Sequence, residues 1–371
     1  MNQMSHFTVE RALLKAKDKT TLGQSALQTA KSVDKIFDTH KRMLIEFLNY
    51  ANQVNVGDVG DVPRTLWDIS GNKLEYIEKY AGGNADVHHV QINGMAMMIK
   101  VQFSTQFDTR PKRADKQTKE PYLQHQCLRH FNYFPAYYVH HKYYSIMEYT
   151  GKDLKIQKMH TQLAGEVNKK KRLALISQLF DPVIKLGEYS LVHGDLKWDN
   201  YTRKVEAIGA NTTSCATLID FDTLTRRGMT MSKQCTHKYA TPERLNKNAQ
   251  NIAYHITEKD DCFALGVMMA EARAGKGSTY VDFLEEIIDS AALKNELTKN
   301  IGRPGSTEHT KTHKQNIETF KNYCDLPENK EDVELQVILR LLNATAPAPS
   351  SDAPSLLIHC KQLIHQYLST L

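Results

Sequence analysis

The feature that most constrains this chain is a short polar stretch after apolar residues, LVHGDLKWDN at positions 191–200. Asp195 is a carboxylate suited to orient an attacking hydroxyl and to accept its proton. Lys197 is suited to neutralise a phosphate that moves, and Asn200 to hold a metal ion through its amide oxygen. Phosphoryl transfer depends mostly on positioning and charge neutralisation, so these side chains on one loop predict that chemistry. Taken alone, the stretch also fits a polar turn after a strand.

A second carboxylate ends another apolar segment, LIDFD at positions 218–222. Asp220 lies 25 positions after Asp195 (220 − 195). Magnesium in nucleotide sites is usually held by one or two protein groups together with the phosphates of the substrate. Asn200 and Asp220 are therefore the predicted metal ligands of one phosphoryl-transfer site.

Two further motifs follow, THKYATPE at 236–243 and DCFALG at 261–266. Read in order, the four stretches resemble the HRDLKxxN, DFG, TxxYxAPE and DxWSxG signatures of the protein kinase superfamily. The resemblance covers roughly residues 70–371. It implies an α+β, two-lobed protein-kinase-like fold, with a small antiparallel β N-lobe, a larger helical C-lobe and an N-terminal helical extension. It also implies that Thr236 hydrogen-bonds the catalytic aspartate and lysine.

The length and the residue patterns predict three parts. Residues 1–65 are expected to be a helical extension and a linker that contains glycines and a proline. Residues 66–150 are expected to form the N-lobe, and residues 151–371 the C-lobe with a helical insertion around 276–330. The expected strands are 73–80, 87–92, 95–103 and 143–149, and the expected helices of the C-lobe are 173–189, 280–297, 317–324, 333–342 and 356–368.

The expected nucleotide is ATP with Mg²⁺ or Mn²⁺. Lys100 ends the run AMMIK at positions 96–100, which resembles the kinase lysine that holds the α- and β-phosphates. Gly82 and Gly83 stand in place of the glycine-rich loop but lack its GxGxxG spacing, and Asp86 adds a carboxylate near the expected phosphates.

Glu120 is the predicted partner of Lys100, because it is the only glutamate between Lys100 and Glu148. Pro121 follows it, which places Glu120 at the start of a helix rather than within one. The segment 143–149 resembles the kinase strand that leads to the adenine site. The residues expected beside the base are Met147, Glu148 and Tyr149.

Three positions depart from the family pattern. Gly194 replaces an arginine that in kinases receives a phosphate on the activation segment, which argues against that switch. Asp222 replaces the glycine of DFG, and predicts either an added metal ligand or a turn cap. No arginine occurs at 343–359, where the family places the partner of the glutamate that is Glu243 here. The partner of Glu243 is left open.

The expected acceptor is a serine or threonine of a protein. Lys197 resembles serine/threonine kinases rather than tyrosine kinases, and the segment from Thr236 to Glu243 is generally lacking in aminoglycoside-type kinases, which share the HGD spelling. The irregular glycine loop also resembles effector kinases that pathogenic bacteria deliver into host cells. Two alternatives stay open: a small-molecule or lipid kinase, and a pseudokinase that acts as a binding module.

A net charge of +6 is too weak to predict a nucleic-acid partner, but it fits an anionic nucleotide or surface. The six cysteines form no CxxC pair, which predicts reduced thiols. The beginning of the chain lacks the pattern of a secretory signal, and no run of about 18 apolar residues occurs. These features predict a cytoplasmic protein, or one delivered into a host cytosol and bound peripherally to a membrane.

Three basic clusters predict a polyanionic activator or anchor, such as an inositol polyphosphate or a phosphoinositide head group. Charge-assisted hydrogen bonds contribute about 1.5–3 kcal/mol each, more than exposed ion pairs. Ordering of the first cluster would position Glu120 against Lys100, whereas plain solvation of the charges is the alternative. The clusters are Arg110, Lys112, Arg113, Lys116 and Lys119; Lys169, Lys170, Lys171 and Arg172; and Arg303, His309, Lys311, His313 and Lys314.

Overall fold

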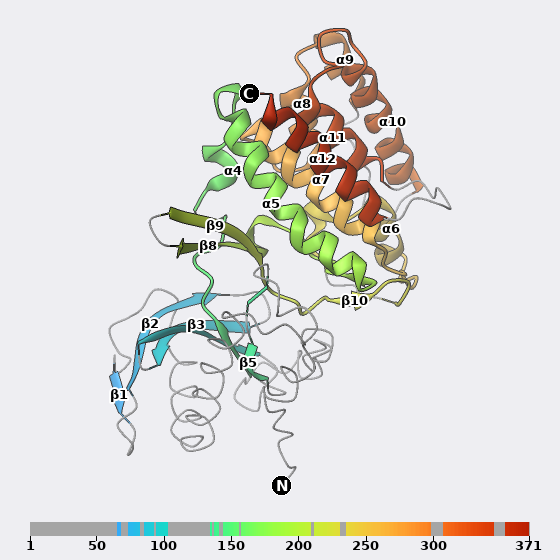
Figure 1. Cartoon of the computed structure of the whole chain (residues 1–371). Helices are drawn as coiled ribbons and strands as arrows, with labels where there is room; N and C mark the ends of the chain where they lie inside the picture. Colours follow the sequence, from blue (N-terminus) through green and yellow to red (C-terminus); the bar gives the residue numbers. More distant parts are fainter. Residues whose placement is uncertain are drawn as a thin grey trace. The chain divides into compact units, whose positions relative to one another are not determined.

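The computed structural model describes the chain in two compact units, Met1–Thr150 and Gly151–Leu371 (Figure 1). The helical extension expected at 1–64 lies outside the described residues, whereas Thr65 of the expected linker already belongs to a strand. The described residues are 65–67, 73–81, 85–92, 94–102, 134–135, 137–140, 144–155, 157–208, 211–230, 235–297, 307–344 and 353–370.

The described part of the first unit is an antiparallel sheet with the strand order β1-β2-β3-β4-β6-β5. Apolar side chains alternate toward a buried face, where Val90, Met97 and Ile99 are 0% exposed. Two residues join β3 to β4, and Gly94 there has a φ of 81°, which suits glycine in a tight turn. The strands are β1 (Thr65–Trp67), β2 (Lys73–Ala81), β3 (Ala85–Ile92), β4 (Met95–Gln102), β5 (Tyr137–His140) and β6 (Tyr144–Glu148).

The second unit is mainly helical, and α5, α7, α11 and α12 pack side by side in it (Figure 1). The helix α7 is central, because 14 of its 17 residues are buried. A β-carbon on Gly266 of α7 would meet Cβ of Leu341 on α11 at 2.9 Å, so glycine lets these two helices approach closely. The helices are α4 (Met159–Gln162), α5 (Lys169–Glu188), α6 (Pro242–Ala249), α7 (Glu258–Ala274), α8 (Tyr280–Ile287), α9 (Ala291–Glu296), α10 (Thr307–Cys324), α11 (Val333–Leu342) and α12 (Ala353–Ser369).

Two short antiparallel pairs of strands frame the loop predicted to be catalytic. The strand β7 (Leu191–Val192) pairs with β10 (Thr225–Arg226) and ends just before the loop. The strand β8 (Tyr201–Ile208) begins just after the loop and pairs with β9 (Asn211–Leu218), which ends two residues before Asp220. The loop and the second carboxylate are thus brought together by adjacent strands.

The expected α+β class is confirmed, with the antiparallel sheet in the first unit and the helices in the second. The helix expected at 280–297 is broken, because the backbone is extended at Ile288 and Ser290, and α8 and α9 result. The helix α10 begins ten residues before the expected 317, since its buried face includes polar residues that hide the apolar period. Those buried polar residues are Thr312, His313, Asn316 and Thr319. No described helix combines the length and the apolar character that a membrane span needs.

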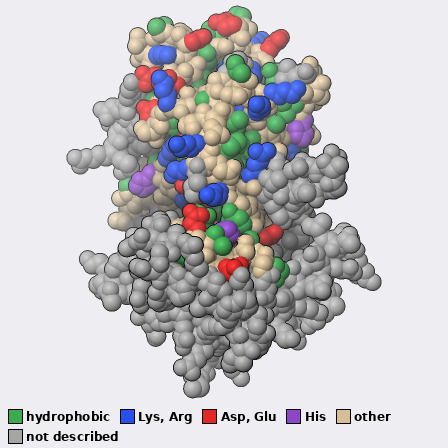
Figure 2. Space-filling view, turned by 90° about the vertical axis from the view of Figure 1, so that its left-hand side faces the viewer, with side chains coloured by type: hydrophobic (Ala, Val, Ile, Leu, Met, Phe, Trp, Pro, Cys, Tyr) green, Lys and Arg blue, Asp and Glu red, His purple; other side chains and the backbone are tan. Residues whose placement is uncertain are grey.

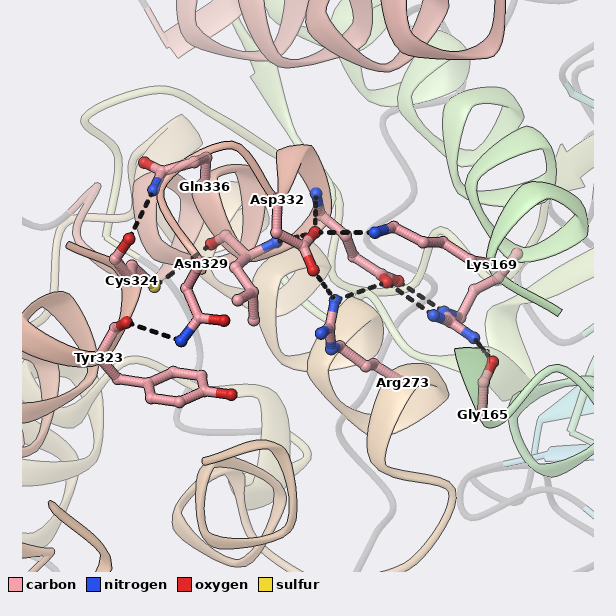
Figure 3. A network of polar contacts seen from close by, with 11 residues as sticks. Gly165, Lys169, Arg273, Tyr323, Cys324, Asn329, Asp332 and Gln336 are labelled. Atoms are coloured by element: carbon pink, nitrogen blue, oxygen red, sulfur yellow. Dashed lines mark hydrogen bonds and ion pairs between the residues drawn. The ribbon is translucent and has the colours of Figure 1, made fainter. Parts of the chain in front are cut away.

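A buried polar network ties α5, α7 and α11 together (Figure 3). Arg172 and Glu334 are both 0% exposed, and the guanidinium binds the carboxylate through hydrogen bonds of 2.5 and 2.6 Å. Arg273 donates to Glu334 and Asp332 at 2.9 Å each, and Lys169 lies 3.3 Å from Asp332. Burial acts to raise the pKa of Asp332, but the nearby Arg273 and Lys169 charges outweigh it and lower that pKa.

This network corrects the prediction of a free basic cluster at 169–172. Lys169 and Arg172 are bound to carboxylates of α11 and its N-cap, so only Lys170 and Lys171 of that cluster are exposed. His313 of the third cluster is only 4% exposed. Figure 2 shows Lys and Arg side chains on this face interspersed with Asp and Glu rather than gathered in one patch. The first cluster, 110–119, and Arg303 lie outside the described residues.

Candidate active site

The backbone of the candidate catalytic loop is held by a carboxylate on the central helix. Asp261, in the first turn of α7, is 2% exposed and accepts hydrogen bonds from the backbone N–H of His193 at 2.8 Å and of Gly194 at 2.9 Å. Burial raises the pKa of Asp261 to about 7, although the two amide bonds act to lower it. The loop is therefore anchored to the core immediately before Asp195.

His193 connects the loop to the end of β9. Its Nδ1 accepts a hydrogen bond from the backbone N–H of Asp195 at 3.3 Å, so Nε2 carries the proton and donates to the carbonyl of Ile219 at 3.1 Å. Burial lowers the pKa of His193, which keeps the imidazole neutral in this arrangement. His193 thereby fixes Asp195 relative to the residue before Asp220.

The structure brings the three predicted catalytic residues into one hydrogen-bonded group. Asp195 accepts from Nζ of Lys197 at 2.7 Å and from the backbone N–H of Thr236 at 2.9 Å. Lys197 also donates to the hydroxyl of Thr236 at 3.1 Å. Burial acts to lower the pKa of Lys197, but the charge and hydrogen bond of Asp195 outweigh it and raise that pKa. Lys197 therefore stays a cation beside the carboxylate.

The two predicted metal ligands are neighbours in the second unit. Asn200 donates its amide N–H to the carbonyl of Asp195 at 2.7 Å, which leaves the amide oxygen for a cation. Its own carbonyl accepts from Ile219 N–H at 2.8 Å, next to Asp220. Asp220 has a φ of 62°, a strained conformation that often marks functional positions.

One amide oxygen and one carboxylate fit a hard cation such as Mg²⁺ or Mn²⁺, which takes its remaining ligands from phosphates and water. The described residues contain no group of three or more His, Cys, Asp or Glu that could hold a metal ion on its own.

The first unit holds the residues predicted to contact the nucleotide. Lys100 on β4 is 8% exposed and lies opposite Ser145 of β6, while Met147 lies opposite Met98. Tyr149 stacks on His89 with ring centroids 3.9 Å apart, at the point where β6 ends. Asp86 lies within β3, opposite Val101, and Glu148 is the last residue of β6. The predicted residues Gly82, Gly83 and Glu120 lie outside the described residues.

Several polar contacts of the site have no signal in the sequence. Tyr239 and Lys238 both bind the carboxylate of Glu271 on α7, at 2.8 and 2.6 Å. Arg244 on α6 donates to the carbonyl of Gly194 at 2.6 Å. Such contacts join positions 32 to 50 apart, so spacing along the chain does not predict them. Asp261 belongs to the DCFALG motif, but the motif did not indicate that this carboxylate binds the backbone of the catalytic loop.

The position of Glu243 answers the third departure from the family pattern. Its carboxylate pairs with Lys247, one turn along α6, at 3.0 Å, and the two side chains are 57% and 37% exposed. An exposed pair of this kind contributes about 0.3–0.5 kcal/mol. The buried Arg–Glu pair of this unit is instead Arg172 with Glu334.

Comparisons with known proteins add little detail. No protein-family model matches this sequence, and no curated protein matches it. Among solved structures, the crystal structure of the kinase domain of PF14_0431 is similar over 77% of this chain and 94% of that chain, with 17% sequence identity and a TM-score of 0.47. The α+β fold class stands on the elements of this chain itself, an antiparallel sheet in the first unit and a mainly helical second unit.

Proposed function

We propose that this protein is an ATP-dependent protein kinase that transfers the γ-phosphoryl group to serine or threonine hydroxyls. The observation that carries the proposal is the group formed by Asp195, Lys197 and Thr236, with hydrogen bonds of 2.7 to 3.1 Å. A carboxylate and a cation held together beside two oxygen ligands supply the positioning and the charge neutralisation that phosphoryl transfer needs.

The chemical step assigns a task to each residue. Asp195 orients the acceptor hydroxyl and takes its proton as the oxygen bonds to the γ-phosphorus, while the bond from that phosphorus to the bridging oxygen of ADP breaks. Lys197 neutralises charge on the transferred group. Asn200 and Asp220 hold Mg²⁺ or Mn²⁺, which supplies charge neutralisation on the phosphates when bound. Lys100 contacts the α- and β-phosphates, and Met147, Glu148 and Tyr149 border the adenine.

A protein acceptor is favoured by the segment that follows Thr236. His237–Tyr239 forms a short 3-10 helix, and Tyr239 and Lys238 anchor it to Glu271 on the central helix. The segment that begins at Thr236 is thus fixed to Asp195 and to α7, and an extended substrate segment is proposed to lie along it. A free metabolite needs no such segment.

The test is transfer from γ-labelled ATP to three classes of acceptor: generic proteins, small metabolites, and lipid vesicles that contain phosphoinositides. We expect labelled phosphoserine or phosphothreonine in protein with wild type and almost none with Asp195→Asn. Label in metabolite or lipid alone would support the small-molecule or lipid kinase. Nucleotide binding without any transfer would support the pseudokinase.

We further propose that a polyanion such as an inositol polyphosphate activates or anchors the protein, a proposal that rests on the basic sequence clusters. The exposed Lys170 and Lys171 are the members of the second cluster that remain available to such a ligand. Titration of inositol hexakisphosphate at fixed salt should raise the melting temperature and the kinase rate. A shift in melting without a change in rate would indicate anchoring alone.

A further inference from the structure

Gly194 makes a turn that places its peptide groups toward two different elements. Its φ of 77° lies in the left-handed region, where any residue with a side chain is strained. Its N–H binds Asp261 of α7 at 2.9 Å, and its carbonyl accepts from Nη1 of Arg244 at 2.6 Å. The peptide units on both sides of Gly194 are thus fixed directly before Asp195.

Arg244 comes from α6, at the end of the segment that begins with Thr236. Its side chain is only 2% exposed, and its backbone N–H binds the hydroxyl of Thr241, the N-cap of α6, at 3.3 Å. The same hydroxyl donates to Asp260 at 3.0 Å, and Tyr254 donates to that carboxylate at 2.8 Å. The backbone of Arg244 is therefore anchored to α7 through Thr241 and Asp260, and the guanidinium extends from this fixed backbone to Gly194.

A small cavity borders Asp195, Thr236 and Arg244 together. The guanidinium thus lies where the catalytic loop, the segment after it and the central helix meet. The backbone N–H of Thr236 binds the carboxylate of Asp195, and Arg244 binds the peptide carbonyl before Asp195.

We infer that Arg244 is a positioning residue that holds Asp195 in its catalytic orientation from within the fold, in the absence of an arginine at position 194. The contact joins α6, at the end of the segment that begins with Thr236, directly to the catalytic loop. A purely structural role for Arg244, as the counter-charge of Asp260 and Asp261, is the competing explanation. The positioning role predicts a lower kcat for the folded variant, and the purely structural role does not.

The kinetic test rests on the proposed function and uses the full chain with Arg244→Met, Arg244→Lys and the matched control Lys247→Ala. Lys247 lies on the same helix, where its Nζ pairs with Glu243 at 3.0 Å and lies 5.6 Å from the ring centroid of Tyr254, whereas Arg244 reaches the catalytic loop itself. Misplacement of a catalytic group by about 1 Å can lower turnover about 10²-fold. We expect Arg244→Met to lower kcat by about 10–100-fold, with KM for ATP and acceptor changed less than about threefold. Arg244→Lys should recover part of kcat, and Lys247→Ala should match wild type.

A second readout needs no activity. Amide hydrogen exchange of the loop at 193–195 should be faster in Arg244→Met than in Lys247→Ala, while exchange in α12 stays the same in both. If the wild-type chain phosphorylates no acceptor, the proposed function fails, and the exchange comparison alone decides this inference. Loop exchange and kcat equal to those of wild type in a folded Arg244→Met would overturn it, as would a rise in KM with kcat unchanged.

Discussion

Asp195 is the residue whose surroundings make the sharpest prediction. Its carboxylate binds both Lys197 and the backbone of Thr236, so Asp195→Asn keeps the shape of the group and removes the proton acceptor. We expect kcat to fall by about 10²–10⁴-fold, the usual size for a positioned proton acceptor. The affinity for ATP should stay within about threefold, because Asp195 is not among the phosphate or metal ligands. Turnover in single-cycle assays measures this, and wild-type turnover would refute the assignment.

Asp220 and Asp222 form a matched pair for testing the metal site. Asp220 is the proposed ligand, whereas Asp222 lies in the turn that the Leu224 N–H to Phe221 carbonyl bond closes at 3.0 Å. We expect Asp220→Asn to weaken activation by Mg²⁺ or Mn²⁺ by about 10–100-fold, the size seen when groups around a metal are removed. Asp222→Asn should leave the metal dependence and the ratio of Mn²⁺ to Mg²⁺ activity unchanged. A changed ratio would make Asp222 a ligand rather than a turn former.

His88 predicts how acid changes stability. Burial, and then the charge of Lys79, lower the pKa of His88 to about 4. The unfolded chain takes up this proton near pH 6.5 and the folded chain does not, so stability is lost as pH falls below about 6.5. We expect roughly 2 kcal/mol less stability from this group at pH 5 than at pH 7.5. Urea unfolding of wild type and of His88→Leu at both pH values measures the contribution of this group. The same loss of unfolding free energy between pH 7.5 and pH 5 in both proteins would contradict the prediction.

At the residue scale, sequence reasoning succeeds where contacts follow spacing. Asp195, Lys197 and Asn200 lie within six positions of one another on one loop, so their order suffices to predict that they contact one another, as they do. The contacts of Arg244 and Glu334 are not predictable from the sequence, because their partners lie 50 and 162 positions away. Their charges look solvated in the sequence, and only the fold shows that they are buried.

At the element scale, the tie between α5 and α11 predicts how the helical unit is stabilised. Removing one member of a buried pair leaves an uncompensated charge, so Arg172→Leu or Glu334→Leu alone should cost about 3–5 kcal/mol of unfolding free energy. The double variant should cost less than either single one, because an apolar pair fills the same space without a buried charge. Arg273 keeps Asp332 as a partner in that variant.

The control for this prediction is an exposed pair on another helix of the same unit. Lys321 and Glu318 on α10 are 48% and 63% exposed, so Lys321→Ala should change stability by only about 0–1 kcal/mol. Urea denaturation followed by circular dichroism compares all four variants. A double variant less stable than both singles would mean that the pair itself is strongly stabilising.

Element boundaries were predictable where apolar periodicity is clear, as in α11, whose bounds match the expected 333–342. They were not predictable where buried residues are polar. The helix α10 buries Thr312, His313 and Asn316, so its N-terminal half lacks the apolar period. The pair β8 and β9 was missed for a similar reason, since their threonines and charged residues do not alternate cleanly with apolar ones.

At the scale of the whole molecule, the described contacts that hold the candidate catalytic group lie within residues 151–371. The anchors Asp261 and Arg244, the proposed metal ligands, and the network around Arg172 belong to that unit. The proposed phosphate contact at Lys100 and the adenine contacts belong to the other unit. We therefore expect folding of the group and the proposed use of ATP to be separable.

We accordingly predict that a piece spanning residues 151–371 folds by itself but does not turn over ATP. Its helices bury a continuous core, in which Phe263, Leu265, Val337 and Leu341 are at most 1% exposed, so a cooperative thermal transition is expected. Hydrogen exchange of the loop at 193–195 should be as slow as in the full chain, because its anchors are retained. Calorimetry and exchange measure these properties, with the Glu334→Leu piece as a destabilised control. A piece that melts without cooperativity would show that residues 1–150 are needed to hold the catalytic group together.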